Sequence, residues 1–94
     1  MGFSSVKQEV IEALLSGDYG HEVRGDIEIK NLLSTGAVTA AAVVDIIKRS
    51  RGGDYACSPH HLAAEIDVHV ITREGWYIKF YFLEPQTMFI SVHQ

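Results

Sequence analysis

Hydrophobic residues recur with a helical period in the first half of the chain. One helical face collects apolar side chains opposite lysine and glutamate: Val6, Val10, Ile11, Leu14 and Leu15. Ser4 or Ser5 opens this pattern, Ser5 and Gln8 have the spacing of a capping box, and Gly17 predicts a left-handed end. The sequence therefore predicts a first helix that ends at Gly17.

A second apolar stripe follows Thr39, which is a good N-cap residue. Its members have helical spacing: Ala40, Val43, Val44 and Ile47. This pattern predicts a helix that ends at Gly52-Gly53.

The segment between the two helices is less clear. Residues Asp18 to Asp26 indicate a loop, because glycines lie at and around it. The stretch from Asp26 to Leu33 fits either a short helix capped by Asp26 or a strand in which Ile27 and Ile29 alternate. The consecutive Leu32 and Leu33 break the alternation and favour the helix.

The last third of the chain changes to a period of two, which is typical of strands. Three alternating runs are separated by a turn at Arg73-Glu74-Gly75 and a turn at Glu84-Pro85-Gln86: 66–72, 76–83 and 87–93. A three-residue hairpin loop often carries glycine last. The chain is therefore predicted to be an α+β domain, with N-terminal helices packed on one face of a C-terminal three- to four-stranded antiparallel meander.

The turns also predict a register. If Thr72 faces Trp76 and Leu83 faces Thr87, both hairpins place their apolar residues on one face. This face is the predicted core, with Phe80 as its best-buried aromatic side chain: Ile66, Val68, Val70, Ile78, Phe80, Phe82, Met88, Ile90 and Val92.

The same register places residues with candidate catalytic and binding side chains on the opposite face of the sheet. It predicts three cross-strand rows, namely His69–Lys79–Ser91, Asp67–Tyr81–Phe89 and Ile71–Tyr77–His93, with His60 and His61 on a loop just upstream. The candidate catalytic residues are His69, Lys79, His93 and Tyr81. The candidate binding residues are Asp67, Tyr77, Ser91, His60 and His61.

Three interpretations of this face stay open. Histidine moves protons near neutral pH and lysine neutralises a phosphodiester transition state, which together favour acid–base chemistry without a metal or cofactor. Aromatic residues at a period of two also stabilise sheets by cross-strand packing, whatever the function. A third interpretation is metal binding by side chains that lack a diagnostic spacing: His60, His61, Asp67, His69 and His93.

Composition narrows the class of protein. The 94 residues fit a single domain over 1–94, and 47% of them are hydrophobic, which is enough for a packed core. The net charge of −4 counts against nucleic acid as the main partner, and the basic cluster Lys48, Arg49 and Arg51 is typical of a helix C-terminus. No apolar run reaches the ~20 residues of a membrane span. With its single cysteine, Cys57, the chain is expected to be soluble and cytoplasmic.

Several short segments resemble MqsR-type toxins, which are mRNA interferases with a RelE-like α+β fold and a partner antitoxin. The segments are Asp54-Tyr55…Ser58, Ile66-Asp67-Val68-His69, Tyr77-Ile78-Lys79 and Ile90-Ser91-Val92-His93. The residues that match the family pattern are Tyr55, Ser58, Asp67, Tyr77, Lys79 and Ser91. The chain departs from the family at Ala56-Cys57 and at His93, where the family has lysines, and at Ile66, where it has glutamine.

Two functions therefore stay open. The first is a toxin-like RNA-binding or endoribonuclease domain, in which His69 and His93 carry protons, Lys79 contacts the phosphate and Tyr81 stacks on a base. A basic strip joining Lys79 to the 48–51 cluster would favour it. The second is a non-enzymatic module that binds an antitoxin-like protein or a second copy of itself through a continuous apolar patch over Tyr77, Tyr81 and Phe89.

Overall fold

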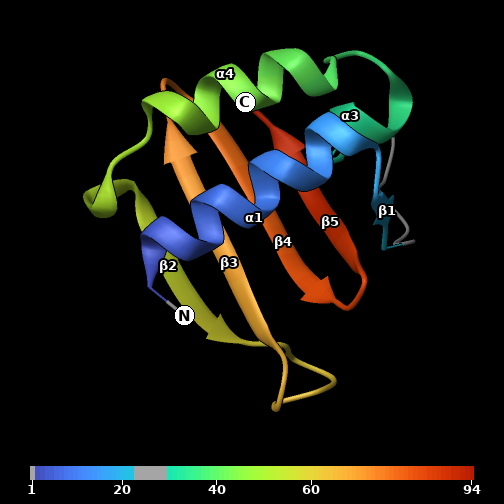
Figure 1. Ribbon diagram of the computed structural model, residues 1–94, viewed down its shortest axis with the longest axis vertical. Coiled ribbons are helices and arrows are strands. Elements are labelled where there is room, and N and C mark those ends of the chain that lie inside the picture. The colour runs from blue at the N-terminus through green and yellow to red at the C-terminus, as the bar shows by residue number, and fades with distance from the viewer. Residues whose placement is uncertain (1, 23–29) are drawn as a thin grey trace.

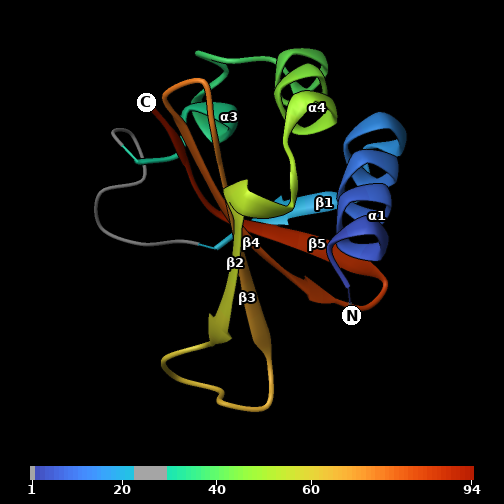
Figure 2. The ribbon, with the colours of Figure 1, turned by 90° about the vertical axis from the view of Figure 1, so that its left-hand side faces the viewer.

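The computed structural model describes residues 2–22 and 30–94. The described residues form a five-stranded sheet in the order β1-β5-β4-β3-β2, and α1 and α4 lie across one face of it (Figures 1 and 2). The elements are α1 (Phe3–Ser16), β1 (Tyr19–His21), α3 (Leu32–Thr35), α4 (Ala40–Arg49), a 3-10 turn (Gly52–Asp54), β2 (Tyr55–Pro59), β3 (Asp67–Arg73), β4 (Trp76–Leu83) and β5 (Gln86–His93).

Helix α1 forms where the apolar periodicity predicts it. Val6 and Val10 are fully buried, and the helix ends at Gly17, whose φ of 83° is left-handed as predicted. The N-terminal prediction is wrong, because the N-cap is Gly2 and Ser5 lies inside the helix. Leu15, predicted on the apolar face, is exposed.

Helix α4 begins as predicted and ends earlier. The Thr39 side chain accepts a hydrogen bond from the Ala42 backbone N–H at 3.1 Å, which confirms the N-cap. The helix ends at Arg49 rather than at the glycine pair, so basic residues occupy its last turn. Its apolar stripe packs beside α1 over the sheet.

The sheet is larger than the predicted meander. Strands β3, β4 and β5 form the expected antiparallel meander, and β2 extends it antiparallel to β3. At the other edge, β1 pairs parallel to β5 within the segment predicted as a loop, which makes the sheet mixed. In the ambiguous segment, Asn31 caps the short α3, and positions 23–29 lie outside the described residues.

The first hairpin corrects the predicted register. Arg73 pairs with Trp76, so the turn has two central residues, Glu74 and Gly75, with φ values of 54° and 81°. Two positive φ values are typical of a type I′ turn. Compared with the three-residue turn that was predicted, this turn shifts β3 by one residue. Every side chain of β3 therefore points to the opposite face from the one predicted.

The second hairpin is also one residue tighter than predicted, and a bulge then restores the register. Leu83 pairs with Gln86 across the turn, where the peptide bond before Pro85 is cis. Ile90 is the extra residue between Phe80↔Phe89 and Lys79↔Ser91. Beyond this bulge, the predicted pairs Ile78–Val92, Lys79–Ser91 and Tyr77–His93 are confirmed.

The two faces of the sheet carry separate apolar clusters. The face under α1 and α4, called the helix face here, contains the main core, in which Phe80 is fully buried as predicted. Phe89, predicted on the opposite face, belongs to this core because the two-residue turn between β4 and β5 pairs it with Phe80. The predicted core residues Val68 and Ile90 lie instead with Tyr81 in a smaller cluster on the other side. No helix among the described residues is long and apolar enough to span a membrane.

Candidate functional site

The candidate site lies on the far face, which is the side of the sheet turned away from α1 and α4 (Figure 2). Three cross-strand rows define it: Thr72–Tyr77–His93, Val70–Lys79–Ser91 and Val68–Tyr81–Met88. The pairs Lys79–Ser91 and Tyr77–His93 are those that the sequence predicts. The residues contributed by β3 differ because its register is shifted by one.

Lys79 and Ser91 form the central pair of the far face. Lys79 is on the middle strand β4 and is half-buried, while Ser91, directly across on β5, is only 8% exposed. Within the described parts of the chain, neither side chain makes a hydrogen bond or an ion pair. An ammonium group and a hydroxyl group therefore lie side by side with their donors available to an anion.

Tyr77 and His93 form an aromatic pair in the neighbouring row. Their ring centroids are 5.2 Å apart with an interplanar angle of 22°, and both side chains are half-buried. The His93 Nδ1 lies 3.1 Å from the Gln94 carbonyl oxygen. Tyr77 precedes Lys79 by two residues, so the stack and the ammonium point to the same side of β4.

His60 anchors the loop after β2 against the far face. Its Nδ1 accepts the Leu62 N–H at 3.1 Å, and its Nε2 lies 3.2 Å from a Glu22 carboxylate oxygen. Its ring also contacts Tyr81 edge-on at 5.2 Å and stacks on His61 at 4.8 Å. His60 is 8% exposed with both nitrogens engaged, so its geometry is that of a structural anchor, and His61 is the exposed member of the pair.

His69 does not lie beside Lys79, which corrects the predicted row. The shifted register turns its side chain to the helix face, where it is 3% exposed and packs against Phe80 and Phe82. Its Nδ1 is 2.7 Å from the Tyr55 hydroxyl. The predicted pair of proton carriers, His69 and His93, is therefore separated by the sheet.

Burial keeps both partners of this hydrogen bond neutral. It lowers the pKa of the His69 imidazole from its usual range. Burial, with further contributions from the Cys57 thiol and the Asp67 carboxylate, raises the pKa of Tyr55 to about 12. The hydrogen bond between the Tyr55 hydroxyl and the His69 Nδ1 therefore joins two neutral groups.

The candidate metal ligands are divided between the two faces. Asp67 is exposed and lies on the same side of β3 as His69, whereas His60, His61 and His93 lie toward the far face. Among residues 2–22 and 30–94, no three His, Cys, Asp or Glu side chains are arranged to hold a metal ion.

Neither surface feature proposed to distinguish the two functions is present as predicted. Arg49 forms two hydrogen bonds with Glu74, at 2.6 and 2.9 Å, and belongs to α4 on the helix side. It does not extend a basic strip to Lys79. The expected apolar patch is also missing, because Tyr81 is only 8% exposed and Phe89 is fully buried.

The sequence prediction missed two polar clusters. One is the Tyr55–His69 hydrogen bond, whose two residues are 14 positions apart on neighbouring strands and have no local spacing signal. The other is an acidic cleft on the helix face, lined by carboxylates from separate elements: Glu9, Glu12, Asp18 and Glu84. Only Glu9 and Glu12 have a spacing, i and i+3, that places them together on one element.

Comparison of the chain with protein-family models, with curated proteins and with solved structures gave no match. The resemblance to MqsR-type toxins therefore stays a prediction.

Proposed function

We propose that the chain is a small RNA-binding domain that holds single-stranded RNA on the far face of its sheet. The observation that carries this proposal is the unpartnered Lys79–Ser91 pair next to the Tyr77–His93 stack. A positive group beside an aromatic platform is the arrangement by which sheets bind single-stranded nucleic acid.

Each of the four side chains has a specific role in the proposal. Lys79 contacts a backbone phosphate, and the Ser91 hydroxyl donates a second hydrogen bond to the same group. The Tyr77–His93 pair supplies the surface on which a base stacks. Because the whole chain carries a net charge of −4, binding is weak and is strongest at low salt.

Binding is supported better than cleavage. Acid–base cleavage of a phosphodiester needs one group to take a proton and another to give one. In the two rows that contain Lys79 and Tyr77, His93 is the one imidazole among the described residues. The proposal is therefore RNA binding. The predicted endoribonuclease function needs His69 as the second proton carrier, and His69 does not lie beside Lys79.

A titration followed by amide NMR tests this proposal. A short single-stranded oligouridylate added at low salt should shift the signals of Tyr77, Lys79, Ser91 and His93 first. The signal of Val10, on α1, should not move. If the RNA leaves the far-face signals unmoved while dilution of the protein shifts Tyr77 and Tyr81, the face is a self-association surface and the proposal is wrong.

A further inference from the structure

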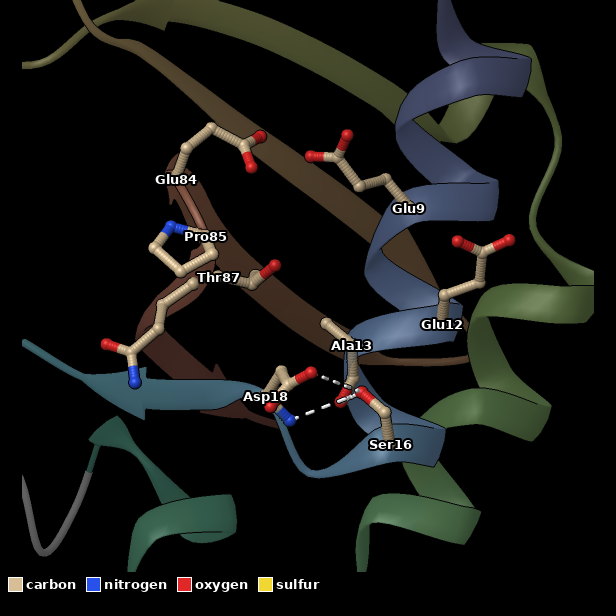
Figure 3. Close-up of a pocket in the computed structure, with 9 residues that line it drawn as sticks. Glu9, Glu12, Ala13, Ser16, Asp18, Glu84, Pro85 and Thr87 are labelled. Carbon is tan, nitrogen blue, oxygen red and sulfur yellow. Dashed lines mark hydrogen bonds between the residues drawn. The ribbon is translucent and has the colours of Figure 1, made fainter.

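An acidic cleft of about 310 Å³ opens on the helix side of the molecule (Figure 3). It lies between α1, the residues that enter β1, and the turn between β4 and β5. Its lining residues are Glu9, Glu12, Ala13, Ser16, Asp18, Glu84, Pro85, Gln86 and Thr87. The volume falls at the lower end of the range for small-molecule pockets, ~300–1,000 Å³.

Four carboxylates line the cleft, and its described lining residues include no cation. Glu12 accepts a hydrogen bond from Gln8, and Asp18 lies within hydrogen-bond distance of Ser16. In the described parts of the chain, no lysine or arginine pairs with any of the four, and none lines the cleft. Burial raises the pKa of Glu9, and the neighbouring charges of Glu84 and Glu12 raise it further.

Thr87 supplies an observation independent of the acidic cluster. Its side chain is only 3% exposed, yet its hydroxyl makes no hydrogen bond with the described residues. Figure 3 shows this hydroxyl pointing into the cleft toward α1. The hydroxyl oxygen is not itself enclosed, so this side chain, held in place by the packing around it, presents a donor and an acceptor to whatever occupies the cleft.

The spacing of the carboxylates selects the kind of cation. Mg²⁺ and Ca²⁺ need several oxygen ligands within ~2.0–2.6 Å, and no three acidic side chains among the described residues are arranged in this way. Figure 3 shows Glu9 and Glu84 facing each other across one end of the cleft, with Asp18 toward the other end. Negative charge spread along a cleft suits an extended ligand with more than one positive group.

We propose that this cleft binds a small aliphatic polyamine. One ammonium group lies between Glu9 and Glu84, a second lies near Asp18, and the Thr87 oxygen accepts a hydrogen bond from the ligand. The proposal is independent of RNA binding, because the cleft and the far face are on opposite sides of the sheet.

Titration of the RNA-free protein with spermidine, followed by amide NMR, tests the polyamine site. Saturable shifts are expected at Ala13, Ser16 and Thr87. Glu84→Gln removes one charge with little change in shape and should weaken binding about tenfold, as expected for loss of a charge-assisted hydrogen bond. Asp45→Asn removes one exposed carboxylate from α4, outside the cleft, and should leave the dissociation constant unchanged.

A second variant and a second ligand distinguish specific binding of spermidine in the cleft from nonspecific attraction of cations to an acidic protein. Thr87→Val keeps the side-chain shape but removes the hydroxyl, and it should weaken spermidine binding several-fold. Magnesium chloride at equal concentration should give no saturable shifts in the cleft. Equal weakening by Asp45→Asn and Glu84→Gln, saturable binding of Mg²⁺ at the same residues, or no response to spermidine would each overturn the proposal.

Discussion

Phe80 is the residue on which the core depends most. It is fully buried on the middle strand and contacts the rings of His69, Phe82 and Phe89 at centroid distances of 5.5, 5.7 and 5.8 Å. Phe80→Ala should lower the free energy of unfolding by about 3–5 kcal/mol, enough to unfold a marginal small domain. Chemical denaturation measures this loss.

Leu83→Ala is the matched control for Phe80. It removes a large apolar side chain from the same strand at a site that is 52% exposed. Its effect should stay within about 0.5 kcal/mol. A loss below about 1 kcal/mol for Phe80→Ala would contradict the placement of this ring in the core.

His69 makes stability depend on pH. Burial lowers its pKa in the folded protein, so the unfolded chain takes up the proton first as the pH falls. The contribution of the neutral imidazole is complete above pH ~6.5 and is lost as the pH falls below that value. Burial lowers the pKa of His21 as well, which adds to the same trend.

His69→Asn should flatten this pH dependence. The asparagine amide has both a donor and an acceptor for the Tyr55 hydroxyl but does not titrate. Melting temperatures measured between pH 7.5 and 5 should fall less steeply for this variant than for the natural chain. His61→Asn, at an exposed imidazole, should keep the natural slope. Identical slopes for both variants would contradict the assignment of a neutral, buried His69.

The β3–β4 turn is the element that sets the register. Gly75 has a φ of 81°, a conformation that costs other residues ~1–2 kcal/mol. Gly75→Ala should therefore destabilise the protein by about that amount. Gly53→Ala is the control, because Gly53 has no positive φ and an added Cβ meets nothing within 4 Å. A thermal melt in which both variants behave alike would rule out the two-residue turn.

The helices were predictable from sequence because their signals are local. The spacing of apolar residues, the Thr39 cap and the left-handed Gly17 all act within a few residues. The edge strands were not predictable in the same way. Strand β1 has three residues, and most of β2 is exposed, so neither shows an alternation of buried and exposed positions.

The register of the strands could not be predicted from the sequence pattern, because both faces of the sheet bury apolar groups. Val68 packs on the far face and Ile71 on the helix face, so the apolar residues of β3 fit either orientation. Glycine at the end of the turn also fits a loop of two residues or of three. Two of the predicted cross-strand pairs, Lys79–Ser91 and Tyr77–His93, are nevertheless present, because the Ile90 bulge restores the register.

The whole molecule separates two charged surfaces by the thickness of one sheet. The far face carries Lys79 at its centre, whereas the helix face carries the acidic cleft beside α1. A phosphate backbone is attracted to the first surface and repelled by the second. RNA should therefore approach from one side only, and substitution of Glu84 should leave its binding site unchanged.

The salt dependence of RNA binding tests the role of Lys79 most directly. Each phosphate contact with single-stranded nucleic acid contributes ~0.7 to the slope of the logarithm of affinity against the logarithm of salt concentration. For a short oligouridylate, Lys79→Ala should weaken binding and reduce this slope by about 0.7. Lys48→Ala, which removes an exposed lysine from α4, should leave the slope unchanged. An unchanged slope for Lys79→Ala, or an equal reduction for both variants, would contradict RNA binding at the far face.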